Sequence, residues 1–395
     1  MHRVLIIVEN LPVPFDRRVW QEATTLKAAG YGVSIICPTG KGCEARYECL
    51  EGIHVYRHSL PIEADGALGY LLEYGWALLS EWWLALKVWR RHGFDAIHAC
   101  NPPDLIFLVG LFFRLFGKRF LFDHHDLNPE LYEAKFNRRD FFWRLMCLFE
   151  RWTFRLADVS IATNQSYRQV AIERGGMPAD KVFVVRSGPK LDRLRIEPAV
   201  PALKQGKAFL VGYVGVMGKQ EGLDLLLQSI AYLVNDKQRT DIHFGLIGGG
   251  TELEALKIMA ADLGVADYVT FTGRVPDADL LAMLNTADVC VNPDIANPMN
   301  DKSTMNKIME YMALGKPIVQ FDLTEGRYSA QDASLYARHN DTVDFANKIL
   351  QLLDDPVMRE RMGAFGRARV EQELSWDHEV PGLLAAYEQL FRGRS

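Results

Sequence analysis

Short apolar runs alternate with longer stretches of helical periodicity along the whole chain. Runs rich in valine, isoleucine and leucine predict buried strands, because strands covered on both faces lose the polar alternation of half-exposed ones. In the first half the predicted strands are Val4–Val8, Val33–Cys37, Ala96–His98, Arg119–Phe122, Val159–Ala162 and Val182–Val185. In the second half they are Leu210–Tyr213, His243–Ile247, Val269–Thr272, Val289–Asn292 and Ile318–Phe321. Strands and helices that alternate in this way predict parallel sheets in α/β layers.

Two sets of strands in a chain of 395 residues predict two domains. We expect Rossmann-like, doubly wound domains at residues 1–195 and 208–374, joined by a linker at 196–207 that carries two prolines and a glycine without periodicity. The helical, aromatic segment 375–395 is expected to cross back to the first domain. Two such domains would face each other across a cleft at the carboxyl ends of their strands, where these sheets bind ligands. A nicotinamide site is disfavoured, because E-N-L-P follows Val8 where that site needs G-x-G-x-x-G.

Composition and charge restrict the partners and the compartment. The first 200 residues carry 26 basic and 23 acidic side chains and the remainder 19 and 27, so nucleic acid is not an expected partner, whereas the first half tolerates an anionic membrane surface. Six scattered cysteines without a C-x-x-C pair favour a reducing cytosol and give no metal site. No apolar stretch reaches the roughly 18 residues of a membrane span, and Val4–Val8 has the character of a strand, not of a signal peptide.

Glycine-rich loops follow three of the strands in the second half. The first contains Gly215 and Gly218 before an apolar helix, which is the arrangement of an anion cradle, and Lys219 adds a positive charge. An ordinary turn between a strand and a helix would use the same glycines, and the spacing does not separate the two interpretations. The second loop, with Gly248 and Gly249, allows a close backbone approach.

The third loop, Gly273-Arg274-Val275, presents a backbone that suits the edge of a nucleobase, although a plain turn fits it equally well. Glu310 lies beyond it, in a predicted short helix that follows a loop and ends at Gly315. Its neighbours Ile308, Met309 and Met312 are apolar, and a carboxylate so placed is costly unless it meets a hydrogen-bond donor. A ribose diol is such a donor.

The first half places charged residues after its strands. Asp16, Arg17 and Arg18 are expected at the mouth of the cleft, where arginines suit a diphosphate of the donor or the acceptor, with a solvated helix start as the alternative. His98 ends one strand and Asp123–Asp126 (D-H-H-D) ends the next. Neighbouring side chains cannot all converge on one ion, so we expect no metal.

Four strand–loop units followed by S-T-M-x-K-x-M-E-Y-M-A-L-G-K-P resemble the C-terminal domain of retaining glycosyltransferases of family 4, over residues 208–330. The pattern is similar to a branch found among capsule, O-antigen and exopolysaccharide transferases, and the first half resembles the family more loosely. The resemblance implies a GT-B fold and a nucleotide-sugar donor, with no active-site metal and no cofactor.

The same resemblance assigns roles to particular residues. Glu310 would hold the donor ribose, the turn Gly215–Lys219 and the loop of Ser303, Thr304 and Met305 would approach the diphosphate, and Arg274–Val275 would border the base. His125 would contact the transferred sugar and Asp126 would orient the imidazole ring. The resemblance implies front-face transfer, in which the departing phosphate takes the acceptor proton.

Three positions depart from the family pattern. Lys302 stands where the first of two glutamates is usual, Val216 replaces an arginine and Glu221 replaces a lysine. Lys219 and Lys302 are candidates to restore the missing positive charge. An inactive relative that only binds nucleotide therefore stays open, as do a nucleotide-sugar epimerase and a phosphorylase that holds pyridoxal phosphate.

We expect transfer of a hexose-type sugar, from UDP before GDP, to a hydroxyl of a lipid-linked saccharide in surface polysaccharide biosynthesis. Residues 69–92 carry Trp76, Trp82, Trp83 and Trp89 next to a basic end. A core helix explains their apolar stripe, whereas tryptophans beside basic residues also suit a membrane interface. The expected location is the cytoplasm, peripheral on the inner face of an anionic membrane.

Overall fold

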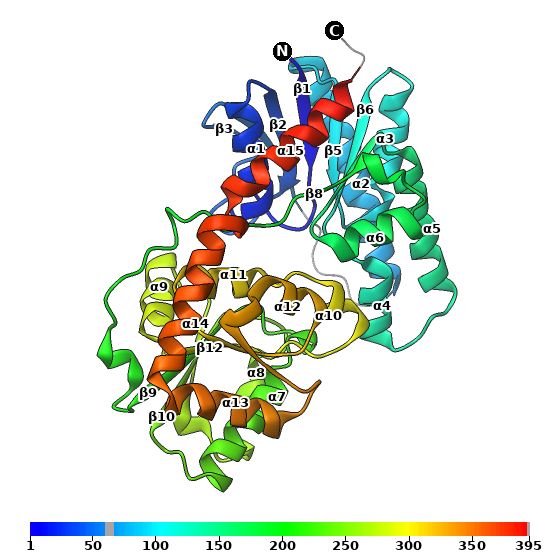
Figure 1. Ribbon diagram of the computed structural model, residues 1–395. Coiled ribbons are helices and arrows are strands. Elements are labelled where there is room, and N and C mark those ends of the chain that lie inside the picture. The colour runs from blue at the N-terminus through cyan, green and yellow to red at the C-terminus, as the bar shows by residue number, and fades with distance from the viewer. Residues whose placement is uncertain (60–66, 393–395) are drawn as a thin grey trace. The chain divides into compact units, whose positions relative to one another are not determined.

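The computed structural model describes residues 1–59 and 67–392 (Figure 1). The chain forms two compact units, with Met1–Ser187 and Glu379–Ser395 in unit 1 and Gly188–His378 in unit 2. Each unit contains its own sheet, and helices cover the faces of both sheets. The predicted fold class, two Rossmann-like α/β domains, is confirmed.

The sheet of unit 1 has eight strands in the order β3-β4-β2-β1-β5-β6-β7-β8, parallel except for the pair β3–β4. The strands are β1 (Arg3–Ile7), β2 (Gly32–Pro38), β3 (Tyr47–Leu50), β4 (Ile53–His58), β5 (Ala96–Cys100), β6 (Arg119–His124), β7 (Val159–Ala162) and β8 (Val182–Val184). The helices are α1 (Arg17–Ala28), α2 (Ala67–Arg91), α3 (Phe107–Arg114), α4 (Asn128–Phe136), α5 (Phe141–Leu156), α6 (Gln165–Glu173) and the 3-10 turns η1 (Asp104–Ile106) and η2 (Ala179–Lys181).

Alternate side chains of β1 feed two separate layers of core, because successive residues of a strand point to opposite faces. Leu5 and Ile7 belong to a buried cluster with residues of α2, α3, α5 and α6. Val4 and Ile6 are equally buried on the other face. In Figure 1 the last helix, α15 (Trp376–Phe391), lies beside α1 over unit 1, and Tyr387 of α15 packs edge-on against Tyr31 with ring centroids 5.4 Å apart.

All six strands predicted in the first half are confirmed, with ends that differ by at most two residues. The hairpin of β3 and β4 was not predicted, because its sequence mixes charged and apolar residues without an apolar run. Its turn places Glu51 at φ 47° and Gly52 at φ 75°, the left-handed pair of a tight hairpin. The dipeptide E-G between two alternating segments was the available signal.

The sheet of unit 2 has six parallel strands in the order β11-β10-β9-β12-β13-β14. The strands are β9 (Phe209–Val214), β10 (Ile242–Ile247), β11 (Val269–Gly273), β12 (Val289–Asn292), β13 (Ile318–Phe321) and β14 (Ser334–Ala337). The α-helices are α7 (Leu223–Ala231), α8 (Leu253–Asp262), α9 (Asp277–Thr286), α10 (Pro298–Lys302), α11 (Asn306–Ala313), α12 (Thr324–Ala330), α13 (Thr342–Asp354) and α14 (Pro356–Arg369). Short 3-10 and π segments are η3 (Pro201–Lys204), η4 (Lys219–Glu221), η5 (Tyr232–Asp236), η6 (Ala266–Tyr268), η7 (Gln331–Ala333) and η8 (Val370–Leu374).

One face of this sheet packs on α7, α8 and α13 and the other on α9 and α11. The five strands predicted in the second half are confirmed, and the short edge strand β14 was missed. The expected loop before Glu310 is partly wrong, because residues 298–302 form the helix α10. Pro298 lies in its first turn, and the side chain of Asn297 accepts hydrogen bonds from the amides of Met299 and Asn300.

The division between the units falls before the expected linker of residues 196–207. The segment after Gly188 is tied into unit 2, where the amide of Glu197 donates to Asn285 at 3.1 Å and that of Val200 donates to Thr286 at 2.8 Å. At the far end, α15 begins in unit 2 and its residues from Glu379 on belong to unit 1. Within the described residues, no helix combines the length and the apolar character that crossing a membrane requires.

Candidate functional site

The loops after β9, β10 and β11 meet at the carboxyl ends of these strands. The amide of Gly215 donates to the carbonyl of Ile247 at 3.0 Å, and that of Gly248 donates to the carbonyl of Gly273 at 3.0 Å. Gly248 has a φ of 135°, and a Cβ there would lie 1.8 Å from the carbonyl oxygen of Gly215. Backbone therefore packs on backbone, which requires glycine and brings the three predicted loops together.

This packing also limits what the first turn offers to an anion. Met217 donates its amide to the carbonyl of Gly249 at 3.1 Å, so the amides of Met217 and Gly215 are both already used. Gly218 is extended, and Lys219 follows it with an exposed side chain at the start of η4. A phosphate at this turn has to depend on charges and on other donors.

Arg274 and Val275 follow β11 next to the second glycine loop. A Cβ on Gly249 would lie 3.8 Å from the side chain of Arg274, whereas Val275 is partly buried against the cluster that contains Leu280. The structure thus brings the predicted base-binding loop beside the predicted phosphate loops.

A buried lysine that the sequence analysis did not select lies under the first turn. Lys307 on α11 places its ammonium 2.6 Å from a carboxylate oxygen of Glu221 and 3.0 Å from one of Asp294, and 4.9 Å from the ring centre of Tyr213. A Cβ on Gly215 would lie 3.4 Å from this ammonium. The acidic residue at position 221 is therefore matched by a cation from α11.

The electrostatics of this cluster follow from burial and close charges. Burial alone would lower the pKa of Lys307, but Asp294, Tyr213 and Glu221 together raise it well above its usual value. Burial raises the pKa of Asp294 to about 7, with Lys307 opposing the shift. Burial would raise the pKa of Glu221, but Lys307 and nearby hydrogen bonds lower it, so Glu221 and Lys307 are the ionised members near neutral pH, whereas Asp294 is partly protonated there.

Glu310 is held by an arginine that the sequence analysis also missed. Arg193 donates to one carboxylate oxygen of Glu310 at 2.5 Å and lies 3.1 Å from a carboxylate oxygen of Asp277 on α9. The side chain of Glu310 is 15% exposed. The donor that this carboxylate needs is therefore provided by the protein, 117 residues away in sequence. An ionised carboxylate has about four acceptor sites, so the bond from Arg193 does not by itself saturate it.

The loop before α11 holds the remaining predicted residues of unit 2. Lys302 ends α10 and is partly exposed. Ser303 donates its hydroxyl to the carbonyl of Met299 at 2.9 Å and its amide to that of Asn300 at 3.2 Å. Thr304 and Met305 lead into α11, with Met305 packed on the core.

In unit 1 the predicted residues gather around Asp123 at the end of β6. Arg18 donates to its two carboxylate oxygens at 2.9 and 3.3 Å, and the Nε2 of His125 lies 2.6 Å from the second oxygen. Arg18 also donates to the carbonyl of Val185 at 2.8 Å. It is buried and engaged inside unit 1, so its charge orients Asp123 and His125 first of all.

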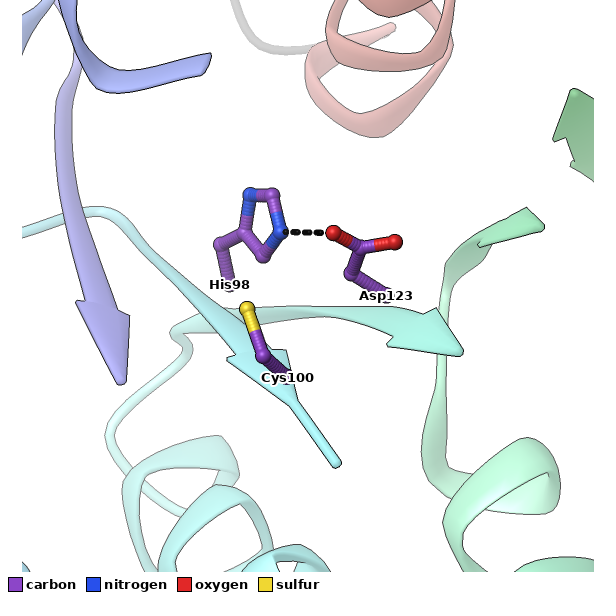
Figure 2. A group of neighbouring side chains, drawn as sticks. All are labelled: His98, Cys100 and Asp123. Atoms are coloured by element: carbon purple, nitrogen blue, oxygen red, sulfur yellow. Dashed lines mark hydrogen bonds and ion pairs between the residues drawn. The ribbon is translucent and has the colours of Figure 1, made fainter. Parts of the chain in front are cut away.

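His98 on β5 also belongs to this cluster. Figure 2 shows its ring directed at the carboxylate of Asp123, with Nε2 to oxygen at 3.3 Å. Its Nδ1 lies 2.7 Å from the hydroxyl of Tyr387 on α15, a partner that the sequence analysis missed. Burial lowers the pKa of His98, and a neutral ring that donates to Asp123 can accept from Tyr387.

The carboxyls of this cluster differ in charge. Burial would raise the pKa of Asp123, but the charges of Arg18 and His125 and the hydrogen bonds from His125 and His98 hold it well below its usual range. Burial and the charge of Asp123 raise the pKa of Glu22, which lies 3.2 Å from Arg18. Asp123 is therefore the ionised member.

A buried asparagine fixes the loop that carries His125 and Asp126. The side-chain oxygen of Asn101 accepts from the amide of His125 at 2.7 Å and from that of Asp126 at 3.1 Å. Its amide nitrogen donates to the carbonyl of Asp126 at 2.7 Å. Burial raises the pKa of Asp126. Asn101 thus sets the backbone from which both predicted catalytic side chains project.

Asp16 and Arg17 take different positions from Arg18. Asp16 caps α1, where its carboxylate accepts from the amide of Val19 at 3.1 Å. Arg17 is exposed at the first position of α1. Of the two predicted arginines, Arg17 is thus the one with an exposed side chain.

Two groups of ligand-type atoms lie within 4.8 Å of one another in the described residues, His98–Cys100–Asp123 and Glu22–Asp123–His125. Figure 2 shows the first of these. Burial, with Asp123 and Glu22, raises the pKa of Cys100 well above its usual value, so its thiol stays protonated and is a poor ligand. Arg18 already places a permanent positive charge on Asp123, which disfavours a metal cation at either group.

Both halves of the chain match known protein families. Residues 16–193 match the family described as "Glycosyltransferase Family 4", and residues 208–355 match "Glycosyl transferases group 1". The chain belongs to glycosyltransferase family 4. It is a glycosyltransferase of the GT-B fold that acts with a nucleotide sugar.

Relatives and solved structures of glycosyltransferases agree with this assignment. The 2-deoxystreptamine glucosyltransferase of Streptomyces kanamyceticus is 25% identical over 334 residues, which cover 79% of this chain and 83% of the relative. Against D-inositol 3-phosphate glycosyltransferases the chain spans little more than half of the relatives' length, 57% for the Thermomonospora curvata protein.

Two solved structures share the fold over nearly the whole chain. Sucrose-phosphate synthase from Thermosynechococcus elongatus has a TM-score of 0.81 at 20% identity and covers 99% of each chain. Anabaena HepE in complex with UDP and glucose has a TM-score of 0.75 at 15% identity, covering 98% of this chain and all of the other.

The buried lysine of this glycosyltransferase gives a test of stability. We expect Lys307→Met to lower the free energy of unfolding by about 3 kcal/mol at pH 8, because it leaves the buried carboxylate of Asp294 and the partly buried one of Glu221 without their cation. In the folded protein Asp294 takes up a proton below its pKa of about 7, whereas in the unfolded chain it does so only near pH 4. A neutral Asp294 needs no cation, so the loss of stability in Lys307→Met should become smaller as the pH falls towards 5. Urea unfolding at pH 8 and pH 5 measures both effects.

The matched control removes the carboxylates as well. Adding Glu221→Gln and Asp294→Asn to Lys307→Met should recover most of the loss, because no uncompensated charge then remains. If the single variant were as stable as the wild type at pH 8, Lys307 would not carry this ion pair.

Proposed function

We propose that the protein is a retaining hexosyltransferase that moves a sugar from a nucleotide diphosphate, UDP before GDP, to a hydroxyl of a lipid-linked saccharide. The reaction belongs to surface polysaccharide biosynthesis and needs neither metal nor cofactor. We place the enzyme on the cytoplasmic face of the membrane as a peripheral protein. The observation that carries the proposal is the oriented carboxylate of Glu310 in the same unit as three converging glycine loops.

The donor nucleotide is assigned to unit 2. Glu310 accepts hydrogen bonds from the ribose hydroxyls, and the backbone at Arg274 and Val275 borders the base. Lys219, Lys302 and the Ser303–Met305 loop face the diphosphate, and Lys307 supports the turn from below. UDP is favoured because the similar HepE structure holds UDP and glucose.

Unit 1 is assigned to the transferred sugar and the acceptor. His125 contacts the sugar, with its ring fixed by Asp123 and Arg18, and Asp126 stands on the backbone that Asn101 sets. Arg17 is the exposed candidate for an acceptor diphosphate. Front-face transfer needs positioning and charge stabilisation more than a protein nucleophile, and the departing phosphate takes the acceptor proton.

Membrane attachment is proposed for one face of unit 1. On α2, Leu84, Ala85 and Val88 are buried in the core. The large apolar side chains that α2, α3 and α5 expose form what we call the aromatic face: Trp76, Leu79, Trp82, Trp83, Leu108, Leu111, Phe141, Phe142, Leu148 and Trp152. Arg90 and Arg91 end α2. Exposed tryptophans beside basic residues favour the interface of an anionic bilayer.

The donor site is tested by ligand-dependent stability. We expect UDP or a UDP-sugar to raise the melting temperature of the wild type, and Glu310→Ala to weaken that binding by about 10- to 100-fold, because hydrogen bonds to a charged group contribute about 1.5–3 kcal/mol. A thermal-shift panel of UDP, GDP, ADP and dTDP with their common sugars measures this. Glu254→Ala, on the exposed side of α8, is the control.

The outcomes separate the classes of function. A shift with one base that is lost in Glu310→Ala, together with product formed on a saccharide acceptor, supports the transferase. Donor turnover without any transfer product would mean an epimerase, and binding without turnover a non-catalytic relative. Near-normal activity in Glu310→Ala would refute its role.

Arg193 gives a second test, of positioning. We expect Arg193→Ala to weaken nucleotide binding by about tenfold without changing the preferred base, because Glu310 loses the bond that orients it. Asp277→Asn removes the ion pair that Arg193 forms with α9 while keeping its bond to Glu310, and should have little effect. Titration by calorimetry measures both, and tighter binding in Arg193→Ala would mean that Arg193 competes with the ribose.

A further inference from the structure

A cavity lies in unit 1, on other elements than those that carry Asp123 and His125. It has a volume of about 490 Å³ and is bounded by the ends of β3 and β4 and by α2. Its lining residues are Arg46, Arg57, His58, Trp76, Leu79, Ser80, Trp83, Leu84 and Lys87.

The polar wall of the cavity is cationic. Arg57 is fixed by the carbonyl of Val13 at 2.7 Å and by the carboxylate of Glu48. Within the described part of the chain, neither Arg46 nor Lys87 forms an ion pair, and Lys87 instead lies 5.2 Å from the ring centre of Trp83. Three cations with one carboxylate leave an excess of positive charge, which favours an anion.

A buried histidine shows that the wall is prepared for a polar ligand. His58 is 3% exposed, and among the described residues neither of its ring nitrogens has a hydrogen-bond partner. The Nε of the buried Arg57 lacks one too. Unsatisfied buried polar atoms are costly, and a bound anion would accept hydrogen bonds from the N–H of the His58 ring and from the Nε–H of Arg57.

The mouth of the cavity is apolar and belongs to the aromatic face. Trp76 is 56% exposed, Leu79 66% and Trp83 59%. A ligand that fits both parts has an anionic head for the wall and an apolar portion for the rim, which is the chemistry of a membrane lipid.

We propose that this cavity binds the phosphate headgroup of an anionic membrane phospholipid. Arg46, Arg57 and Lys87 meet the phosphate, His58 donates a hydrogen bond to it, and Trp76 and Trp83 lie at the level of the lipid headgroups. The proposal deepens the membrane attachment proposed above and is independent of the transfer reaction.

Vesicle binding distinguishes a specific lipid site in the cavity from general electrostatic attraction to an anionic membrane. We expect the wild type to sediment with phosphatidylglycerol–phosphatidylcholine vesicles and the double variant Arg46→Ala/Lys87→Ala to bind at least about tenfold more weakly. Lys27→Ala/Lys41→Ala removes the same charge from exposed positions of unit 1 that belong neither to the cavity nor to the aromatic face, and should bind within about threefold of the wild type. Equal losses of vesicle binding in the two double variants would overturn the proposed lipid site in the cavity and leave only non-specific electrostatic attraction.

Tryptophan emission gives a second, local measurement. Trp83 lines the cavity and Trp82 does not. Anionic vesicles should shift the emission of the wild type and of Trp82→Phe to the blue, and Trp76→Phe/Trp83→Phe, which removes both tryptophans of the cavity, should lose most of that shift. An unchanged shift in this double variant would contradict the proposal.

Two further outcomes would also overturn it. If the wild type ignored anionic vesicles at low salt, both the lipid site and the membrane attachment would fail, whereas the nucleotide shifts would still test the transferase. If glycerol phosphate raised the melting temperature and vesicles did not bind, the cavity would belong to a soluble phosphate ester.

Discussion

The cost of burying carboxylates at the carboxyl ends of parallel strands governs both sites. Three site carboxylates each meet a cation that comes from a different element of the same unit; the pairs are Asp123–Arg18, Asp294–Lys307 and Glu310–Arg193. Such pairs add little net stability over an apolar replacement, but losing one partner is expensive, so they fix geometry more than they stabilise the fold. The strand ends can therefore hold polar groups in defined directions where a ligand would meet them.

The protonation states of the carboxyl groups in these clusters decide which groups donate hydrogen bonds and which accept them. In unit 1 the ionised Asp123 lies next to Glu22, whose raised pKa keeps it neutral, so a single negative charge is shared among Arg18, His98 and His125. In unit 2 the amides of the first glycine turn are used by neighbouring backbone, and the turn is supported from below by Lys307. Both sites are thus organised before any ligand arrives, which reduces the reorganisation that binding requires.

Apolar runs were sufficient to predict eleven strands, because a strand buried on both faces has little choice of residue. They did not predict β3, β4 and β14, which lie towards sheet edges and mix polar with apolar positions. At the site, Glu310 was predictable from its apolar neighbours, and glycine loops from their spacing. Arg193 and Lys307 were not, because their partners lie 117 and 86 residues away and only the folded chain brings them together. Asn101 was missed for the same reason, because the amides that it binds lie 24 and 25 residues away.

The sequence pattern of helix α2 does not decide which of its apolar residues are buried, but the structure does. Its tryptophans and leucines spread nearly all round the helix, so core packing and membrane contact compete as explanations of the same residues. Burial separates them, because Leu84, Ala85 and Val88 enter the core whereas Trp76 and Trp83 stay exposed beside Lys87. Core packing therefore accounts for one face of the helix, and the membrane contact that we propose concerns only the other, exposed face. A helix whose one face is packed in the core holds the side chains of its other face in place. The entropic cost of ordering those side chains in a contact with a membrane or a partner is then smaller.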